Sequence, residues 1–165
     1  DAPVRELLAV AEATRDVCGR AGVPFFVNDR VDIALAVGAD GVHVGENDLP
    51  ASVARRLLGP GASIGVTAYT PPMARAALEE GGDYVGFGPV YGTQSKANAR
   101  GATGLDGLTG FAASCSLPIL AIGSVRAENI PELLDAGAHG VAVISAVCCA
   151  PDVTAAASAF ARSLP

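Results

Sequence analysis

The sequence predicts an α/β fold of the (β/α)8 TIM barrel type, and three observations support this prediction. Short apolar runs typical of buried parallel strands alternate with helical patterns along the chain. A helix end, a glycine and a strand recur together in AVGADGVHV, EEGGDYVGF and DAGAHGVAV. Glycines also gather after the last two predicted strands, where barrels commonly bind phosphate. A doubly wound nucleotide-binding sheet would instead place its glycine-rich loop after the first strand.

The individual elements follow from apolar spacing and glycine stops. The first helix has apolar residues at helical spacing from Val4 to Val17 and stops at Gly22. The run VPFFVN then predicts a strand over 23–28. Further strands are predicted at 41–44, 63–66, 84–88, 118–122 and 140–144. Further helices are predicted at 30–38, 51–58, 71–81, 106–115, 127–136 and 152–163, with a glycine-rich loop over 91–104.

The glycines after the last two predicted strands indicate which strands of a barrel the chain contains. If 118–122 and 140–144 are barrel strands seven and eight, strand 23–28 is the third. We therefore expect a barrel that lacks strand 1, helix 1 and strand 2. No linker or charge run divides the chain, so we expect one partial barrel domain over residues 1–165.

Composition and charge exclude several classes of protein. The 165 residues are 50% hydrophobic and 17% charged, which suits a globular core rather than disorder. The net charge is −6 and Lys and Arg do not cluster, so nucleic-acid and membrane partners are not expected. Four cysteines without metal-ligand spacing suggest reduced thiols in a cytoplasmic protein. We expect small-molecule substrates, and the sequence is compatible with a homo-oligomer.

Polar residues follow two neighbouring predicted strands. Asn28 and Asp29 end strand 23–28, and Asp48 lies just beyond strand 41–44. Neighbouring strands are roughly 5 Å apart, so the two carboxylates can converge on one cation. Hard oxygen ligands without His or Cys favour Mg²⁺ over Zn²⁺. The alternative is that both aspartates are helix N-caps, and spacing alone does not decide between the two interpretations.

The later loops carry groups suited to an anion. Thr93, Ser95 and Lys96 offer hydroxyl and ammonium donors in a glycine-rich loop, although a solvated surface loop is the alternative. Gly123-Ser124 and Ile144-Ser145 follow consecutive strands, where glycine allows close approach and a helix start favours phosphate. An ordinary tight turn is the alternative there.

Five other polar or aromatic residues lie in or beside the predicted strands. Thr67 follows strand 63–66 and suits either a ligand contact or a helix N-cap. His43, between two valines, is interpreted as a packed, hydrogen-bonded core residue, and His139 as part of a remote turn. Tyr69 and Tyr91 lie in loops at the carboxyl ends of strands, where they could cover an aromatic substrate.

Together these residues resemble the thiamine-phosphate synthase (thiamine-phosphate pyrophosphorylase) family. The resemblance covers essentially the whole chain and is carried by FFVNDRVDIALAVGADGVHVGENDLP, ARRLLGPGASIGVT, DYVGFGPVYGTQSK, GLDGL, AIGSV and GVAVISAV. It implies a Mg²⁺-dependent transferase of thiamine biosynthesis. Such an enzyme joins hydroxymethylpyrimidine pyrophosphate to thiazole phosphate and releases pyrophosphate.

The resemblance also implies residue roles by position. Asp29 and Asp48 would hold Mg²⁺, and Lys96 and Thr67 would be the catalytic residues. The pyrimidine substrate would contact Asn28, Thr67 and Lys96. The thiazole phosphate would be held by Thr93, Gln94, Ser95, Ser124, Ile144 and Ser145.

Several departures from the family pattern leave alternatives open. The family's Q-L-R-x-K stretch would stand immediately before Asp1 and is not in this sequence. Ser124 replaces a glycine, Glu46 a glutamine, Gly92 a proline and Thr67 a serine. A degenerate phosphate-binding barrel without activity is therefore one alternative. The other is a thiazole tautomerase-like isomerase, which uses a His where this chain has Tyr69.

Overall fold

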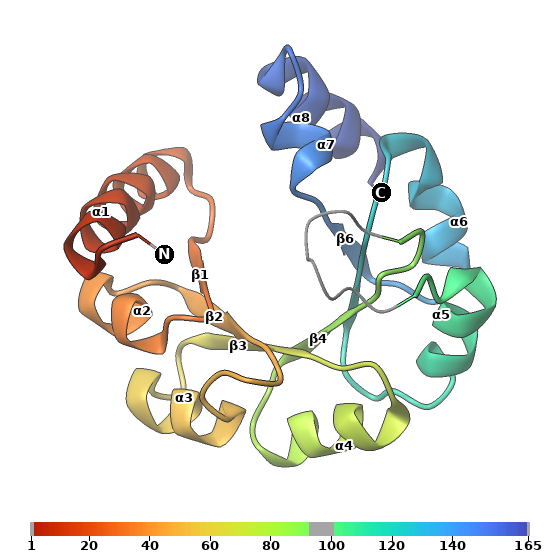
Figure 1. The fold of residues 1–165 in the computed structure, drawn as a ribbon, viewed down its shortest axis with the longest axis horizontal. Coiled ribbons are helices and arrows are strands. Elements are labelled where there is room, and N and C mark those ends of the chain that lie inside the picture. The colour runs from red at the N-terminus through yellow and green to blue at the C-terminus, as the bar shows by residue number, and fades with distance from the viewer. Residues whose placement is uncertain (1, 93–100, 165) are drawn as a thin grey trace. The chain divides into compact units, whose positions relative to one another are not determined.

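The computed structural model describes residues 2–92 and 101–164, and the chain divides into two compact units. Unit 1 comprises Asp1–Thr67 with Ala76–Asp83, and unit 2 comprises Ala68–Arg75 with Tyr84–Pro165. In Figure 1 helices alternate with strands along the chain, as the sequence predicts for an α/β fold. The single domain and the eight-stranded barrel stay predictions.

Unit 1 is built on three parallel strands in chain order. Its elements are α1 (Val4–Ala21), β1 (Phe26–Asn28), α2 (Val31–Val37), β2 (Gly41–Val44), α3 (Ala51–Leu58) and β3 (Ser63–Thr67). Helix α4 (Pro71–Glu79) contributes residues to both units. The strand predicted over 23–28 begins only at Phe26, because Pro24 has no N–H for a strand ladder.

Unit 2 repeats the pattern with β4 to β6, which are again parallel and in chain order. Its elements are β4 (Tyr84–Phe87), α5 (Gly104–Ala112), β5 (Ile119–Ile122), η1 (Ala127–Asn129), α6 (Ile130–Asp135), β6 (Gly140–Ala142), α7 (Ser145–Cys148) and α8 (Val153–Ser163). Three expectations need correction. Helix α5 runs from Gly104 to Ala112 rather than over 106–115, and the helix predicted over 127–136 begins with the 3-10 turn η1. The strand predicted to 144 ends at Ala142, since Ile144 is the N-cap of α7.

The core of unit 1 lies between its strands and helices α2 and α3. Val42, Val44 and Ile64 pack there against Ala34 and Ala54, all at most 2% exposed. Because side chains alternate along a strand, the residues between these positions lie on the opposite face of the sheet. On that face the strand register sets Asn28 beside His43, and His43 beside Gly65.

In unit 2 the same alternation separates a helix-facing layer from a glycine-rich one. Phe87 stacks on Phe111 of α5, with ring centroids 4.3 Å apart, and pairs in register with buried Ala121. On the other face Leu120 stands between Gly86 and Gly140, which leave space for its larger side chain. No helix of the described residues is long and apolar enough to cross a bilayer.

Three residues that each stand just before a strand make the same pair of hydrogen bonds with a residue earlier in the chain. The N–H groups of Asp40, Asp83 and His139 donate to the carbonyls of Phe25, Ile64 and Ile119, at 2.8–2.9 Å. Their side chains accept the N–H groups of the same three partners, at 2.7 Å for each carboxylate and 3.2 Å for His139 Nδ1. These residues occupy the fifth and central position of the recurring nine-residue phrase, so the repeat encodes a reciprocal backbone clamp.

His139 offers a test of this clamp, because it replaces the aspartate of the other two repeats. We expect His139→Ala to lower the free energy of unfolding by about 1 kcal/mol, since the buried Ile119 N–H loses its acceptor. His139→Asp should retain most of the stability. Urea unfolding of the three proteins measures both values, and equal losses for Ala and Asp would contradict the clamp.

Candidate functional site

The loop after β1 presents Asp29 in an unusual backbone conformation. Asp29 has a φ of 64°, in the left-handed region that Asp and Asn tolerate better than most residues. Its N–H donates to the carbonyl of His43 at 2.8 Å, and the N–H of Arg30 donates to the carbonyl of Asn28 at 2.7 Å. These bonds fix the backbone that carries the carboxylate at the carboxyl end of β1.

Asp48 is held inside the loop after β2. Its Oδ2 accepts the N–H of Gly45 at 2.7 Å, and its own N–H donates to the Gly45 carbonyl at 3.2 Å. An added Cβ at Gly45 would lie 3.1 Å from that carboxylate oxygen, so the glycine permits the turn. A carboxylate offers about four acceptor positions, and this bond uses one.

The alternative that both aspartates cap helices is wrong. Arg30 is the N-cap of α2 and Pro50 that of α3, and neither helix start has a side-chain cap bond. Thr67 caps no helix either, because α4 begins at Pro71 with Thr70 accepting its first described backbone bond. The loop positions of these three side chains therefore need another explanation.

The donor set of unit 1 fits Mg²⁺ better than a metal that needs several protein ligands. In residues 2–92 and 101–164 no three His, Cys, Asp or Glu side chains gather as a metal site. Mg²⁺ usually takes one or two carboxylates and completes its shell with waters and substrate phosphates. Asp29 and Asp48, which follow consecutive strands, match that habit.

His43 is the residue that sequence reasoning missed. Its Nε2 lies 2.9 Å from Oγ1 of Thr67, and both side chains are only half-buried. The alternation of β2 held the signal: Val42 and Val44 point into the core, so the residue between them shares a face with Asn28. His43 is thus tied to a predicted site residue rather than enclosed in the core.

In unit 2 the loops after β4 and β5 are bonded to each other. The N–H of Val90 donates to the Ile122 carbonyl at 2.8 Å, and the N–H of Tyr91 donates to the Gly123 carbonyl at 3.3 Å. Gly123 has a φ of 107°, and an added Cβ would lie 2.5 Å from Cβ of Pro89. The glycine is therefore required by packing within the protein, whatever ligand it also approaches.

Two residues of unit 2 predicted to bind phosphate are Ser124, which follows Gly123, and Ser145, which lies beyond β6. Ser124 is exposed and has a φ of 49°, the other described non-glycine residue with positive φ besides Asp29. Ser145 is the first residue of α7, whose backbone bonds begin only with the N–H groups of Val147 and Cys148. The N–H groups at the start of α7 have no acceptor within the helix, as at any helix start.

Tyr91 is bonded rather than open toward a ligand. Its phenol donates to Oε1 of Glu132 on α6 at 2.5 Å, and Nδ2 of Asn129 donates to the same oxygen at 2.9 Å. Burial, followed by the hydrogen bond and charge of Glu132, raises the pKa of Tyr91 to about 12. The predicted role of Tyr69 stays a prediction, and Thr93, Gln94, Ser95 and Lys96 lie outside the described residues.

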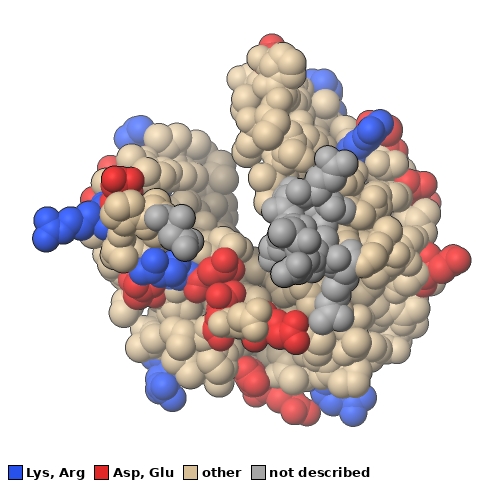
Figure 2. Space-filling model, viewed as in Figure 1, with Lys and Arg blue, Asp and Glu red and all other residues tan. Residues whose placement is uncertain are grey.

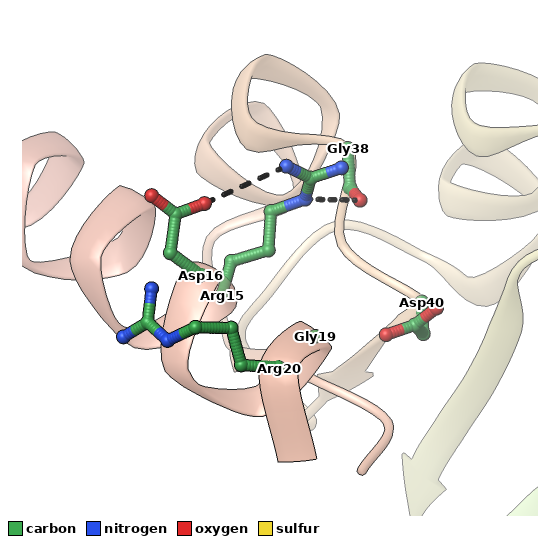
Figure 3. A pocket seen from close by; sticks show the side chains of 6 residues that line it. All are labelled: Arg15, Asp16, Gly19, Arg20, Gly38 and Asp40. Atoms are coloured by element: carbon green, nitrogen blue, oxygen red, sulfur yellow. Dashed lines mark hydrogen bonds and ion pairs between the residues drawn. The ribbon is translucent and has the colours of Figure 1, made fainter. Parts of the chain in front are cut away.

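A cavity of about 420 Å³ in unit 1 lies away from the predicted site residues. Figure 3 shows its lining, with the Arg15 guanidinium directed to the carbonyl of Gly38, 3.3 Å from Nε, and to the Asp16 carboxylate. Gly38 and Asp40 precede β2, so this cavity is at the amino end of that strand.

On the face shown in Figure 2, Lys and Arg are dispersed among Asp and Glu.

Ser124 allows a test of backbone strain. We expect Ser124→Gly to raise the free energy of unfolding by about 0.5–1 kcal/mol, because glycine adopts a positive φ without steric cost. Ser124→Ala is the matched control that removes the hydroxyl and keeps the strain. Thermal and urea unfolding compare the three, and a Gly variant no more stable than Ala would contradict the strain.

Tyr91 gives a pH-dependent prediction. Its pKa is raised in the folded protein, so its contribution to stability is complete below pH 10 and is lost as the pH rises toward about 12. Tyr91→Phe should be less stable than the parent protein at pH 8, and this difference should shrink above pH 10. A difference that is constant from pH 8 to pH 11 would show that the phenol bond is unimportant.

Comparison with known proteins shows similarity of this chain to one family. The family model described as thiamine monophosphate synthase matches residues 1–147. A thiamine-phosphate synthase of Chloroflexus aurantiacus is 49% identical over 94% of this chain and 72% of its own length. One of Moorella thermoacetica is 50% identical over 94% and 74%.

A solved structure agrees with the sequence relatives. The thiamine phosphate pyrophosphorylase from Pyrococcus furiosus is 38% identical, with a TM-score of 0.87 over 99% of this chain and 78% of that protein. The match includes the loops that carry Asp29, Asp48, Thr67, Ser124 and Ser145. The chain belongs to the thiamine monophosphate synthase family.

Proposed function

We propose that this protein is a thiamine-phosphate synthase, a transferase that couples hydroxymethylpyrimidine pyrophosphate with thiazole phosphate. Relatives about half identical to the chain carry that name. The observation that carries the proposal is the pair Asp29 and Asp48, which follow consecutive strands and cap no helix. Tyr69 stands where the tautomerase-like alternative requires a His, which argues against that isomerase.

The loops of unit 1 bind the pyrimidine pyrophosphate in this proposal. Asp29 and Asp48 would hold Mg²⁺, which would supply positive charge to stabilise the pyrophosphate leaving group. Asn28 and Thr67 orient the pyrimidine ring, and Lys96 donates to the departing oxygen. The carbon–oxygen bond breaks with its electron pair on pyrophosphate, and the thiazole nitrogen then attacks the pyrimidine carbon. No protein nucleophile takes part.

A charge argument supports the need for a cation. Asp29, Glu46 and Asp48 bring three carboxylates into the loops after β1 and β2, and two of them are needed by the proposed site. A pyrophosphate is itself an anion, so these loops would repel it in the absence of a counter-charge. A divalent cation between carboxylates and pyrophosphate converts this repulsion into attraction.

The loops of unit 2 bind the thiazole phosphate. Ser124 and Ser145 offer hydroxyl groups, and the N–H groups at the start of α7 offer donors without an intrahelical acceptor. Ile144 contributes as the N-cap that orients this turn, and Gly123 allows the neighbouring loop to pack closely. Thr93, Gln94 and Ser95 complete this half of the proposal.

The proposal extends to the complete fold and its location. It includes an eight-stranded barrel and a cytoplasmic enzyme, the latter supported by four free thiols at Cys18, Cys115, Cys148 and Cys149. The alternative is a phosphate-binding barrel without activity, and the following assay distinguishes it from an active enzyme.

The decisive assay supplies both substrates to protein expressed from the complete reading frame, with and without Mg²⁺. We expect Mg²⁺-dependent release of pyrophosphate with formation of thiamine phosphate. Asp29→Asn, Asp48→Asn and Lys96→Ala should each lower kcat by about a hundredfold, because each removes charge stabilisation of the leaving group. Asn is chosen at position 29 because it tolerates the positive φ.

Asp135→Asn on α6 is the matched control for loss of a carboxylate, and it should keep the parent rate. Equal thermal unfolding of the Asp29 and Asp48 variants excludes loss of fold as the cause. Turnover without metal, or no turnover by the parent protein, would contradict the proposed function.

A further inference from the structure

The contact between His43 and Thr67 joins two strands at the carboxyl end of the unit 1 sheet. His43 stands beside Asn28 and Gly65 in the strand register, and Thr67 is two residues beyond Gly65 on the same face. The imidazole passes the position of Gly65, which carries no side chain, and its Nε2 reaches Thr67 Oγ1 at 2.9 Å. The distance is that of a well-formed hydrogen bond.

The direction of this hydrogen bond determines what Thr67 can offer to a ligand. A threonine hydroxyl has one proton and two acceptor lone pairs, and a neutral imidazole has one N–H and one bare nitrogen. If Nε2 carries the proton, it donates to Oγ1 and the hydroxyl proton is available to a ligand. If Nε2 is bare, the hydroxyl donates to it, and Thr67 can only accept from a ligand.

We propose that His43 is a positioning residue that holds Thr67 as a hydrogen-bond donor toward the pyrimidine pyrophosphate, through an Nε2–H tautomer. This inference rests on the proposed function. His43 does not contact the reacting atoms, and it acts through the orientation of the Thr67 hydroxyl. The histidine thereby selects a ligand that presents an acceptor, such as a ring nitrogen or a phosphate oxygen, at this point.

The composition of the neighbouring loops of unit 1 favours the donor arrangement. The loops after β1 and β2 supply carboxylates at Asp29, Glu46 and Asp48, which are acceptors when ionised. A pyrimidine ring and a pyrophosphate also present mainly acceptors. Donors are therefore the scarce groups here, and a Thr67 that only accepts would duplicate what the carboxylates already offer.

Two substitutions at His43 separate positioning from simple packing. The amide nitrogen of glutamine reaches about as far as Nε2, whereas that of asparagine reaches only as far as Nδ1. We expect His43→Gln to keep at least about half of kcat/KM for the pyrimidine substrate. His43→Asn should lose about tenfold, the factor of one ordinary hydrogen bond. KM for thiazole phosphate should not change, and equal rates for Gln and Asn would overturn the proposal.

A double-mutant cycle tests whether His43 acts through Thr67. Thr67→Val keeps the shape of the side chain and removes its hydroxyl. In that background His43→Asn should change kcat/KM by less than about twofold, because no hydroxyl remains to be positioned. A tenfold loss in both backgrounds would show that His43 acts independently and would overturn the proposal. His139→Asp, at the amino end of β6, is the histidine control and should keep the parent rate.

Imidazole nitrogen NMR tests the same bond without turnover, so it distinguishes this inference from the proposed function. The signals that disappear in His43→Gln are those of His43. We expect the Nε2–H tautomer in the parent protein and faster exchange of that proton with water in Thr67→Val. An Nδ1–H tautomer, or an unchanged His43 signal in Thr67→Val, would overturn the proposal even if the enzyme is active. Inactive parent protein with the expected spectra would contradict only the proposed function.

Discussion

In both units the parallel strands are held in register by a residue that stands just before the next strand and exchanges two hydrogen bonds with the strand behind it. Asp40 fills this role in unit 1 and His139 in unit 2. Because the side-chain period of a strand is two residues, a slip of one residue would exchange its two faces. In unit 1 such a slip would move His43 into the core and Val42 out of it. The clamp at one end of the strands therefore determines which polar groups are available at the other.

The carboxyl ends of the strands carry the conformational cost of this arrangement. Asp29 follows β1 and Ser124 follows β5 by one further residue, and both have positive φ although neither is glycine. Non-glycine residues in this region cost of order 1–3 kcal/mol each and gather at functional sites. The surrounding bonds hold them there: Asp29 is fixed by the His43 carbonyl, and Ser124 follows a glycine enclosed by Pro89. Among the described residues, the non-glycine positions with positive φ therefore lie in loops at the carboxyl ends of strands, where the proposed ligand contacts are.

The sequence predicted much of this because its signals are local. Glycine stops and apolar runs located every described strand to within three residues, and AVGADGVHV held both the helix end and the register residue. The site was predictable in composition but not in geometry. Spacing could not separate a metal ligand from a helix cap at Asp29, since that depends on the backbone angle of one residue. His43 was correctly expected to be hydrogen-bonded, but it is only half-buried, and its partner Thr67 could not be identified because it is 24 residues away, on another strand. Gly123 was attributed to ligand approach, whereas Pro89 already requires it.

The enclosure of Gly123 also constrains how this part of the protein can change over time. Pro89 and the Gly92 carbonyl occupy the space that any side chain at position 123 would need. Two backbone bonds join the same loops, from Val90 to Ile122 and from Tyr91 to Gly123. A length change at 89–91 or at 122–123 would break contacts in the other stretch, so these two short stretches constrain each other. Substitution of exposed side chains beside them, such as Ser124, leaves those contacts in place.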